Sequence, residues 1–285
     1  MTALRRARPS LGTLVEMRVE GLCERDALRA LDAAFAEVQQ VHRCMSFHAA
    51  DSDLARLHAS AWGTALRVDA RTHAVLDAAQ AMAHESHGVF DVSVAAVLVQ
   101  LGLLPRPVSA FQPDPGADWR DIELLDDNRV RLRRPLWIDL GGIAKGYAVD
   151  RAIEVLVAHG ASHASVNAGG DLRLHGPRSE AVFLRVGRGL TRMPQLELAD
   201  AALATSARDG YDDAVRPHLH GITRMPLRGG ASASVVADRC MVADALTKVV
   251  LAADAQLTER VLCAFGAEAC VLDPAHGWQR LGRAA

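Results

Sequence analysis

The chain has 285 residues, of which 50% are hydrophobic and 23% charged, and its 32 basic and 34 acidic side chains leave a formal net charge of −2. This composition excludes an intrinsically disordered chain, and the charge balance argues against a nucleic-acid coat or a basic membrane-surface protein. Because only 4% of the residues are aromatic and no apolar run is long enough to cross a bilayer, we expect a globular protein with no nucleic-acid partner and no membrane span.

The first half of the chain alternates between strand and helix patterns. Apolar residues indicate a strand over 11–19, and they recur at helical spacing over 25–42 and 70–85. The Asp51-Ser52 dipeptide is a candidate cap for a short helix. Four prolines then mark a loop over 103–118, so we expect no regular element there.

The second half predicts hairpins separated by helices. The segment 122–125, the turn Asp126-Asp127-Asn128 and the apolar run 130–140 predict a β-hairpin whose second strand ends at Asp139. The other expected elements are a helix over 143–158, strands over 163–167 and 171–174, strands within 181–205, a loop over 207–230, a strand over 232–236, helices over 241–253 and 256–264, and a strand over 268–271. Strands in hairpin pairs favour the α+β class. We expect one domain over 1–285, with antiparallel or mixed sheets and flanking helices.

The five cysteines and the amino terminus bear on the compartment. The cysteines form no CxxC pair and their number is odd, so we expect free thiols in a reducing compartment. The basic first ten residues precede no apolar segment of the kind found in a secretory signal. We therefore expect a cytoplasmic protein, or a periplasmic one if the chain is a processed form.

The densest group of candidate site residues is WIDLGGIAKGYAVDRA, at 137–152. We expect Gly141 and Gly142 to form a turn after Asp139, and a helix to begin near Ile143 with Lys145 in its first turns. Free backbone N–H groups at a helix start, together with an ammonium group, form an anion site, and glycines let a phosphate approach closely. The alternative is a structural turn capped by Asp139, with Lys145 in solvent. The motif matches neither a Walker A sequence nor GxGxxG.

Three further features have both a structural and a functional interpretation. The NAGGD sequence at 167–171 joins two strands, as a simple hairpin turn also does. Asp244 and Thr247 lie on one face of an expected helix, where they either supply oxygens to a hard cation or complement the helix dipole. His218 and His220 lie in the polar loop before that helix. No HExxH, GxSxG or paired cysteine–histidine spacing occurs, so zinc and serine-hydrolase chemistry have little support.

Taken in chain order, these motifs resemble those of the ApbE family of FAD:protein FMN transferases. The blocks that carry the resemblance are Leu11-Gly12-Thr13, MSFH at 45–48, SDLARLH at 52–58, GVFDVSV at 88–94, IDLGGIAKGYAVDRAIE at 138–154, VNAGGDL at 166–172, ATSA at 204–207 and ADALTK at 243–248. They extend over most of the chain. The IDLGGIAKGYAVD and ADAL segments are specific to the family, whereas the GGD and SDL segments are not.

The resemblance implies a Mg²⁺-dependent transferase that moves the FMN part of FAD onto a threonine or serine hydroxyl of an acceptor protein, with a phosphoester formed and AMP released. The residues that the resemblance places against FAD are Leu11, Phe47, Val89, Phe90, Asp91, Asp139, Lys145 and Ile222. The metal would be held by the Gly142 carbonyl, Asp244, Thr247 and the position of Lys248. His220 would relay the proton of the acceptor hydroxyl, and Asp244 would act in catalysis through its cation.

The chain departs from the family's pattern at two places. Lys248 stands where the family has a metal-ligating threonine, so it points away from the metal, replaces part of its charge or weakens its binding. The loop after His220 also lacks the family's Asp-Pro. Two alternatives to a transferase therefore stay open: an FAD-binding carrier or regulatory protein without transfer activity, and an FAD pyrophosphatase.

Overall fold

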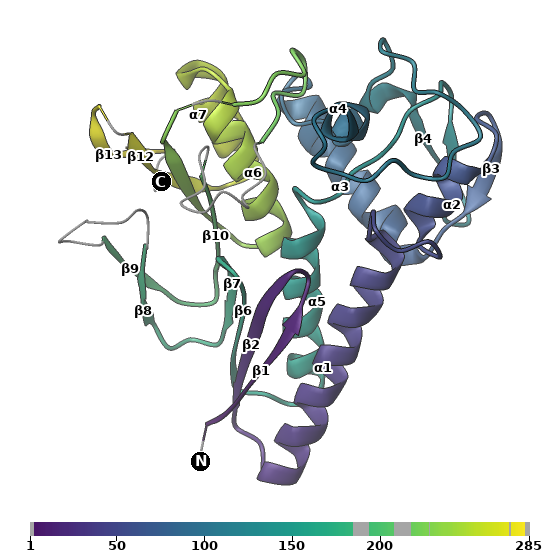
Figure 1. Cartoon of the computed structure of the whole chain (residues 1–285). Coiled ribbons are helices and arrows are strands. Elements are labelled where there is room, and N and C mark those ends of the chain that lie inside the picture. Colours follow the sequence, from purple (N-terminus) through teal and green to yellow (C-terminus); the bar gives the residue numbers. More distant parts are fainter. Residues whose placement is uncertain (1–2, 185–193, 208–217, 228, 274, 283–285) are drawn as a thin grey trace. The chain divides into compact units, whose positions relative to one another are not determined.

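The computed structural model describes residues 3–184, 194–207, 218–227, 229–273 and 275–282 (Figure 1). These residues divide into two compact units. The first comprises the described residues within 1–39, 145–217 and 228–285, and the second those within 40–144 and 218–227. Both units combine helices with antiparallel sheets, which confirms the α+β class. The single domain over 1–285 stays a prediction.

The first unit contains an eight-stranded sheet in which every neighbouring pair is antiparallel. In sheet order the strands are β1 (Leu4–Ser10), β2 (Thr13–Glu20), β6 (His163–Ala168), β7 (Asp171–His175), β10 (Ala202–Ala207), β11 (Ser232–Ala237), β12 (Glu268–Asp273) and β13 (Gly277–Leu281). A separate pair is formed by β8 (Glu180–Phe183) and β9 (Gln195–Leu198). Every described strand of the unit therefore belongs to one of two sheets.

Four helices contribute to the first unit: α1 (Glu24–Met45), of which the residues up to Gln39 belong here, α5 (Ala144–Ala158), which enters the unit at Lys145, α6 (Cys240–Ala252) and α7 (Ala255–Ala264). Helix α6 packs on β7, β10 and β11, and α7 packs on β12 and β13 (Figure 1). One face of the sheet is apolar because side chains alternate along a strand: Val15 and Met17 are buried opposite Ala168 and Val166.

The second unit contains helices and a three-stranded sheet. Its helices are α2 (Asp53–Ala59), α3 (Ala70–Glu85), α4 (Ala95–Gln100) and the short 3-10 turns η1 (Val92–Val94) and η2 (Trp119–Asp121). Its strands pair in the order β3 (Ala65–Arg67), β5 (Arg129–Leu132), β4 (Ile122–Leu125). Ser52 caps α2 by accepting a hydrogen bond from the Ala55 N–H at 3.0 Å, as its sequence position predicted.

Several expectations need correction. The strand expected over 11–19 begins only at Thr13, as β2, because Leu11 and Gly12 adopt φ of 55° and 73° and turn the chain between β1 and β2. The second strand of the 122–140 hairpin ends at Leu132 and does not reach Asp139, since Pro135 has no N–H for a ladder. Strands β1 and β13 and helix α4 were not expected. Parts of the 181–205 and 207–230 segments lie outside the described residues.

Candidate functional site

Two carboxylates and two ammonium groups form a cluster in the first unit. Lys145 in the first turn of α5 forms an ion pair with Asp171 at the start of β7. Lys248 forms an ion pair with Asp244 one turn earlier on α6. The two carboxylates are almost fully buried, with side-chain exposures of 2% for Asp171 and 1% for Asp244. The cluster therefore places four charges of balanced sign at the α5, β7 and α6 elements.

Close packing of α5 against α6 fixes this geometry. Gly146 has no side chain, and a Cβ built there would lie 2.3 Å from the Cys240 carbonyl oxygen. The Gly146 N–H donates to Asp244 Oδ2 at 3.1 Å. Asp150 accepts from the Cys240 and Met241 N–H groups at 2.8 and 2.9 Å, so a side chain of α5 caps the start of α6. The N-cap residue of α6, Arg239, makes no capping hydrogen bond with its side chain, so Asp150 of α5 caps the helix in its place.

Burial and the charges of neighbouring side chains shift the pKa values of the cluster. Burial, reinforced by the charge of Asp244, raises the pKa of Asp171. Burial would also raise the pKa of Asp244, but the ammonium groups of Lys248 and Lys145 outweigh it and lower that pKa. Burial opposes the charge on Lys145, yet Asp171 and Asp244 outweigh this effect and raise the lysine's pKa. Lys145 is therefore a fixed cation whose side chain is still about a third exposed (32%).

The oxygens of α6 that are expected to bind a metal are engaged within the protein. Thr247 donates its hydroxyl proton to the Asp244 carbonyl at 2.7 Å and lies 2.8 Å from the Ser206 hydroxyl. Lys248 Nζ donates to the same carbonyl at 2.9 Å and to Asp244 Oδ1. Lys248 thus points toward Asp244 and not away from it. Among the described residues, no group of three or more His, Cys, Asp or Glu side chains is placed to hold a metal ion.

In the second unit, the 218–227 segment docks on the end of the 88–91 segment. The Gly221 N–H donates to the Val89 carbonyl at 2.9 Å. A Cβ at Gly221 would lie 2.2 Å from the Gly88 carbonyl oxygen, so only glycine allows this approach. Val89, Phe90 and Asp91, all expected to contact FAD, are at most 7% exposed. The loop that carries His220 is therefore held directly against them.

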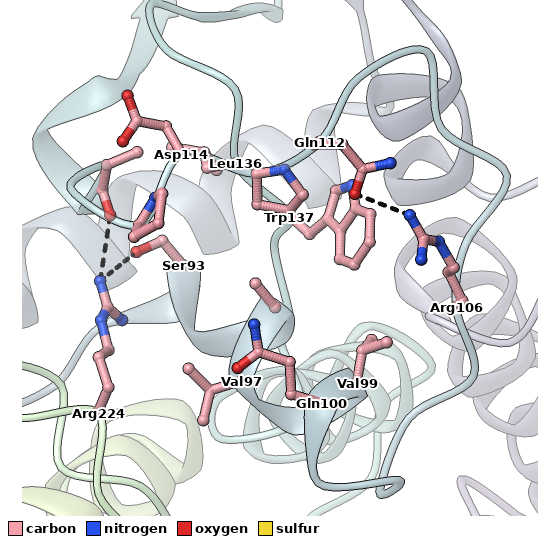
Figure 2. Close-up of a pocket in the computed structure, with 14 residues that line it drawn as sticks. Ser93, Val97, Val99, Gln100, Arg106, Gln112, Asp114, Leu136, Trp137 and Arg224 are labelled. Carbon is pink, nitrogen blue, oxygen red and sulfur yellow. Dashed lines mark hydrogen bonds between the residues drawn. The ribbon is translucent and has the colours of Figure 1, made fainter.

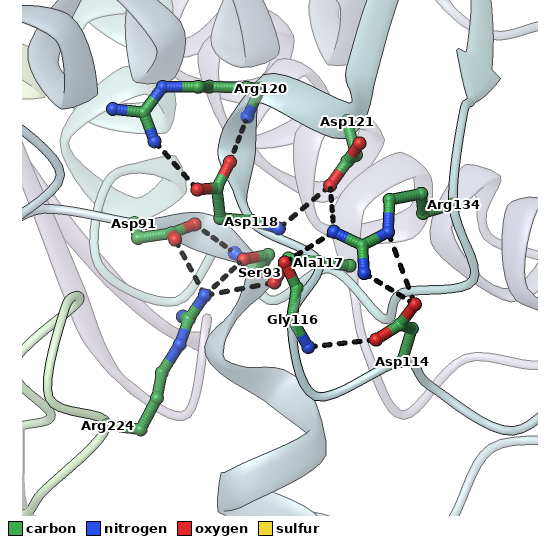
Figure 3. Close-up of polar contacts among 10 residues, drawn as sticks. All are labelled: Asp91, Ser93, Asp114, Gly116, Ala117, Asp118, Arg120, Asp121, Arg134 and Arg224. Atoms are coloured by element: carbon green, nitrogen blue, oxygen red, sulfur yellow. Dashed lines mark hydrogen bonds and ion pairs between the residues drawn. The ribbon is translucent and has the colours of Figure 1, made fainter.

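Arg224 forms the centre of a polar network in the same unit (Figure 3). Its Nη2 donates to Asp91 Oδ2 at 2.8 Å and to Ser93 Oγ at 2.9 Å, while the Ser93 N–H donates to Asp91 Oδ1 at 2.7 Å. Burial still raises the pKa of Asp91, although Arg224 acts in the opposite direction. Both carboxylate oxygens of Asp91 are engaged, so a contact of this side chain with FAD must share them with Arg224.

Two cavities flank Arg224. One of about 370 Å³ is lined by Arg106, Gln112 and Trp137, with Arg224 at its edge (Figure 2). The other, of about 280 Å³, is lined by Asp91, Trp119, Ile222 and Arg224. Trp119 Nε1 and Arg224 Nη1 are buried and have no hydrogen-bond partner among the described residues. Trp119 and Arg224 both line the smaller cavity, while these two donor atoms are themselves covered by protein.

His220 has a defined hydrogen-bonding state. Its Nδ1 accepts from the Ile222 and Thr223 N–H groups at 3.2 and 3.4 Å. An imidazole that accepts on Nδ1 carries its proton on Nε2 when neutral. Burial lowers the pKa of His220, which favours this neutral form. Ile222 beside it is 60% exposed, an unusual position for a large apolar side chain.

Asp139 lies near the turn that begins helix α5, and Phe47 lies near the apolar core of the second unit. The Asp139 N–H donates to the Val92 carbonyl at 2.8 Å. The Asp139 carboxylate lies over Gly141, since a Cβ there would be 3.1 Å from Oδ2. The Phe47 ring lies 5.5 Å from the His58 ring and packs against the buried cluster that contains Trp137.

The structure groups the expected residues by unit. Those in the first unit are Leu11, Lys145, Asp244, Thr247 and Lys248. Those in the second unit are Phe47, Val89, Phe90, Asp91, Asp139, Gly142, His220 and Ile222. A single site formed by both groups stays a prediction. Sequence reasoning missed Asp171, because GGD also fits a simple turn, and Arg224 and Trp119, for which no motif gave a signal.

Comparison with known proteins identifies the family of this chain. A model of the ApbE family matches residues 11–271. The chain belongs to the ApbE family. Among the residues that the structure describes, no helix is both long enough and apolar enough to cross a membrane.

Two curated relatives carry the name FAD:protein FMN transferase. The protein from Treponema pallidum is 30% identical over 279 residues, which cover 85% of this chain and 76% of the relative. The protein from Rhodobacter capsulatus is 29% identical, and the match covers 90% of this chain but 53% of the relative. The chain thus spans about half the length of the Rhodobacter protein.

Solved structures confirm the fold. The ApbE protein of Thermotoga maritima superposes with a TM-score of 0.83 at 26% identity, covering 98% of this chain and 97% of that one. The flavin transferase ApbE of Vibrio cholerae superposes with a TM-score of 0.80 at 20% identity, covering 98% and 96%. At that lower identity the similarity concerns the fold alone.

Proposed function

We propose that this chain transfers the FMN part of FAD to a threonine or serine hydroxyl of an acceptor protein, with a phosphoester formed and AMP released. The observation that carries the proposal is the fixed cation Lys145, which the buried Asp171 holds in the first turn of α5. The name of the relatives from Treponema and Rhodobacter, FAD:protein FMN transferase, supports the transfer of FMN from FAD to a protein.

Transfer at phosphorus depends on positioning and on neutralising negative charge. Lys145 is partly exposed while its partner Asp171 is buried, so the ammonium group can contact a phosphate oxygen without leaving the carboxylate. The N–H groups at the start of α5 add positive potential at the same place. The attacking hydroxyl belongs to the acceptor protein, and AMP leaves with the electrons of the broken P–O bond.

His220 is the proposed group for proton movement at the acceptor hydroxyl. In the tautomer described above, Nε2 carries the proton and donates a hydrogen bond. His220 therefore acts first as a donor to an oxygen at the reacting phosphate, and it accepts the hydroxyl proton only after its two weak Nδ1 contacts break.

The family resemblance also implies Mg²⁺, which would neutralise negative charge on the diphosphate of FAD. Its expected ligands on α6 do not fit the ion as they stand. Asp244 Oδ1 is held by Lys248 and Oδ2 by the Gly146 N–H, and Thr247 donates to a backbone carbonyl. As they are bonded in the structure, these residues do not form a magnesium site.

The test combines the purified chain, FAD, Mg²⁺ and a flavin-accepting protein, with in-gel flavin fluorescence and AMP release as the two readouts. Transfer predicts a labelled acceptor and equimolar AMP. Free FMN with AMP but no labelled acceptor would identify an FAD pyrophosphatase, and bound FAD without AMP would identify a carrier.

Substitution of Lys145 addresses the site itself. Lys145→Met removes the ammonium group and keeps the apolar stem, so we expect a loss of transfer by a factor of about one hundred or more. Arg280→Met is the matched control, because Arg280 is an exposed cation paired with Glu268. Equal activity of the Lys145 variant and the control would exclude Lys145 from the site.

A further inference from the structure

Lys248 has the contacts of a bound cation. Its Nζ lies 2.9 Å from the Asp244 carbonyl oxygen and forms an ion pair with Asp244 Oδ1. The side chain is 13% exposed, so most of it is packed inside the protein. A carboxylate oxygen and a carbonyl oxygen are the ligand types that a hard divalent cation takes in proteins. At Asp244 the ammonium group thus lies against two oxygens of that kind.

Charge balance favours the ammonium group over a metal at this place. Asp171 and Asp244 are already neutralised by Lys145 and Lys248. A divalent ion at Asp244 would add two positive charges to this balanced group and would lie beside an ammonium group of the same sign. It would also displace Lys248 from its acceptors and leave a mostly buried charge without a partner.

We propose that Lys248 is a built-in cation that takes the place of a divalent metal at Asp244. Nζ carries three N–H donors, and its described contacts direct two of them to Asp244. The third is left for an oxygen of a nucleotide diphosphate. Lys145 and Lys248 together then hold the diphosphate without a metal ion. The nucleotide part of this proposal depends on the proposed function; the metal part does not.

Metal binding is measured first on the unmodified chain, with Mn²⁺ as the probe and the EPR signal of free Mn²⁺ as the readout. We expect the signal of free Mn²⁺ to be undiminished at equimolar protein and metal, with FAD absent. Loss of that signal in a stoichiometric titration of the unmodified chain would overturn the proposal, whatever any variant does.

Two variants separate the charge of Lys248 from its packing. Lys248→Thr restores a hydroxyl and frees Asp244, so we expect Mn²⁺ to bind about tenfold or more tighter than in the unmodified chain. Lys248→Met is the matched control, because it frees Asp244 but offers no oxygen, and we expect it to bind Mn²⁺ less tightly than the threonine variant. Adding Asp244→Asn to Lys248→Thr should remove the gain. A folded threonine variant with unchanged Mn²⁺ affinity contradicts the proposal.

Quenching of flavin fluorescence measures FAD binding in excess EDTA and in excess Mg²⁺. Equal affinity in the two conditions supports a diphosphate site without a metal, and binding that requires Mg²⁺ overturns it. Absence of FAD binding in both conditions would instead refute the proposed function. The Mn²⁺ titration without FAD then still decides whether Lys248 occupies the cation position.

Discussion

Gly146→Ala tests the packing on which the charged cluster depends. Alanine is the better helix former, so the substitution considered by propensity alone would stabilise α5 by about 1 kcal/mol. In the structure, however, the new Cβ would lie 2.3 Å from the Cys240 carbonyl oxygen and 2.8 Å from the Met241 Cα. Both atoms belong to backbone, which cannot rotate away as a side chain can. We therefore expect the steric effect to prevail.

The size of the loss follows from two contributions. Overpacking of this kind costs about 1–3 kcal/mol. Separation of α5 from α6 also weakens the bond from the Gly146 N–H to the buried Asp244 carboxylate, and a hydrogen bond to a charged group contributes about 1.5–3 kcal/mol. After subtraction of the gain in helix propensity, the net destabilisation is about 1.5–5 kcal/mol.

Urea denaturation followed by far-UV circular dichroism measures this change, provided that the m-value stays constant. Ala36→Gly is the control, since Ala36 is an exposed position inside α1. Replacing alanine by glycine there lowers the helix propensity and introduces no steric clash. We expect the control to lose about 1 kcal/mol. If Gly146→Ala is as stable as the unmodified chain or more stable, the close approach of α5 and α6 is wrong.

Two further predictions concern the second unit. His58 is buried and its Nε2 accepts from the Ile138 N–H at 2.9 Å, and burial lowers its pKa from 6.5 to about 4. Because the pKa of His58 is lower in the folded protein than in the unfolded chain, protonation favours unfolding. The free energy of unfolding is therefore highest above pH 6.5, and it decreases by about 3 kcal/mol in total as the pH falls toward 4. His58→Gln should remove this contribution to the acid slope, measured by urea denaturation at several pH values; an unchanged slope would contradict the assignment. Arg224→Ala leaves the buried Asp91 carboxylate unpaired, and we expect a loss of about 2 kcal/mol, less than for a fully buried pair because Arg224 is 22% exposed. Adding Asp91→Asn should recover part of that loss in the same assay, whereas strictly additive losses would show that the two side chains are not coupled.

The sequence by itself determined those features that depend on local interactions. The helix expected over 70–85 has the bounds of α3, because its apolar spacing and the Asp69 cap lie within a few turns of each other. The Asp-Asp-Asn turn between β4 and β5 is likewise a local signal, and two of its residues adopt positive φ. The blocks that resemble the ApbE family, IDLGGIAKGYAVD among them, sufficed to indicate the family, since the residues within each block are adjacent in the chain.

Only the tertiary structure decided which charges meet. Lys145 and Asp171 are 26 residues apart, and Asp91 and Arg224 are 133 residues apart, so no local pattern specifies either pair. The direction of Lys248 is different, because its partner lies four residues away. The sequence left three roles open for Lys248, and the structure contradicts one of them, because the side chain points toward Asp244 and not away from it. A buried carboxylate needs a counter-charge. The tertiary fold decides which residue supplies that charge, because it brings distant parts of the chain together.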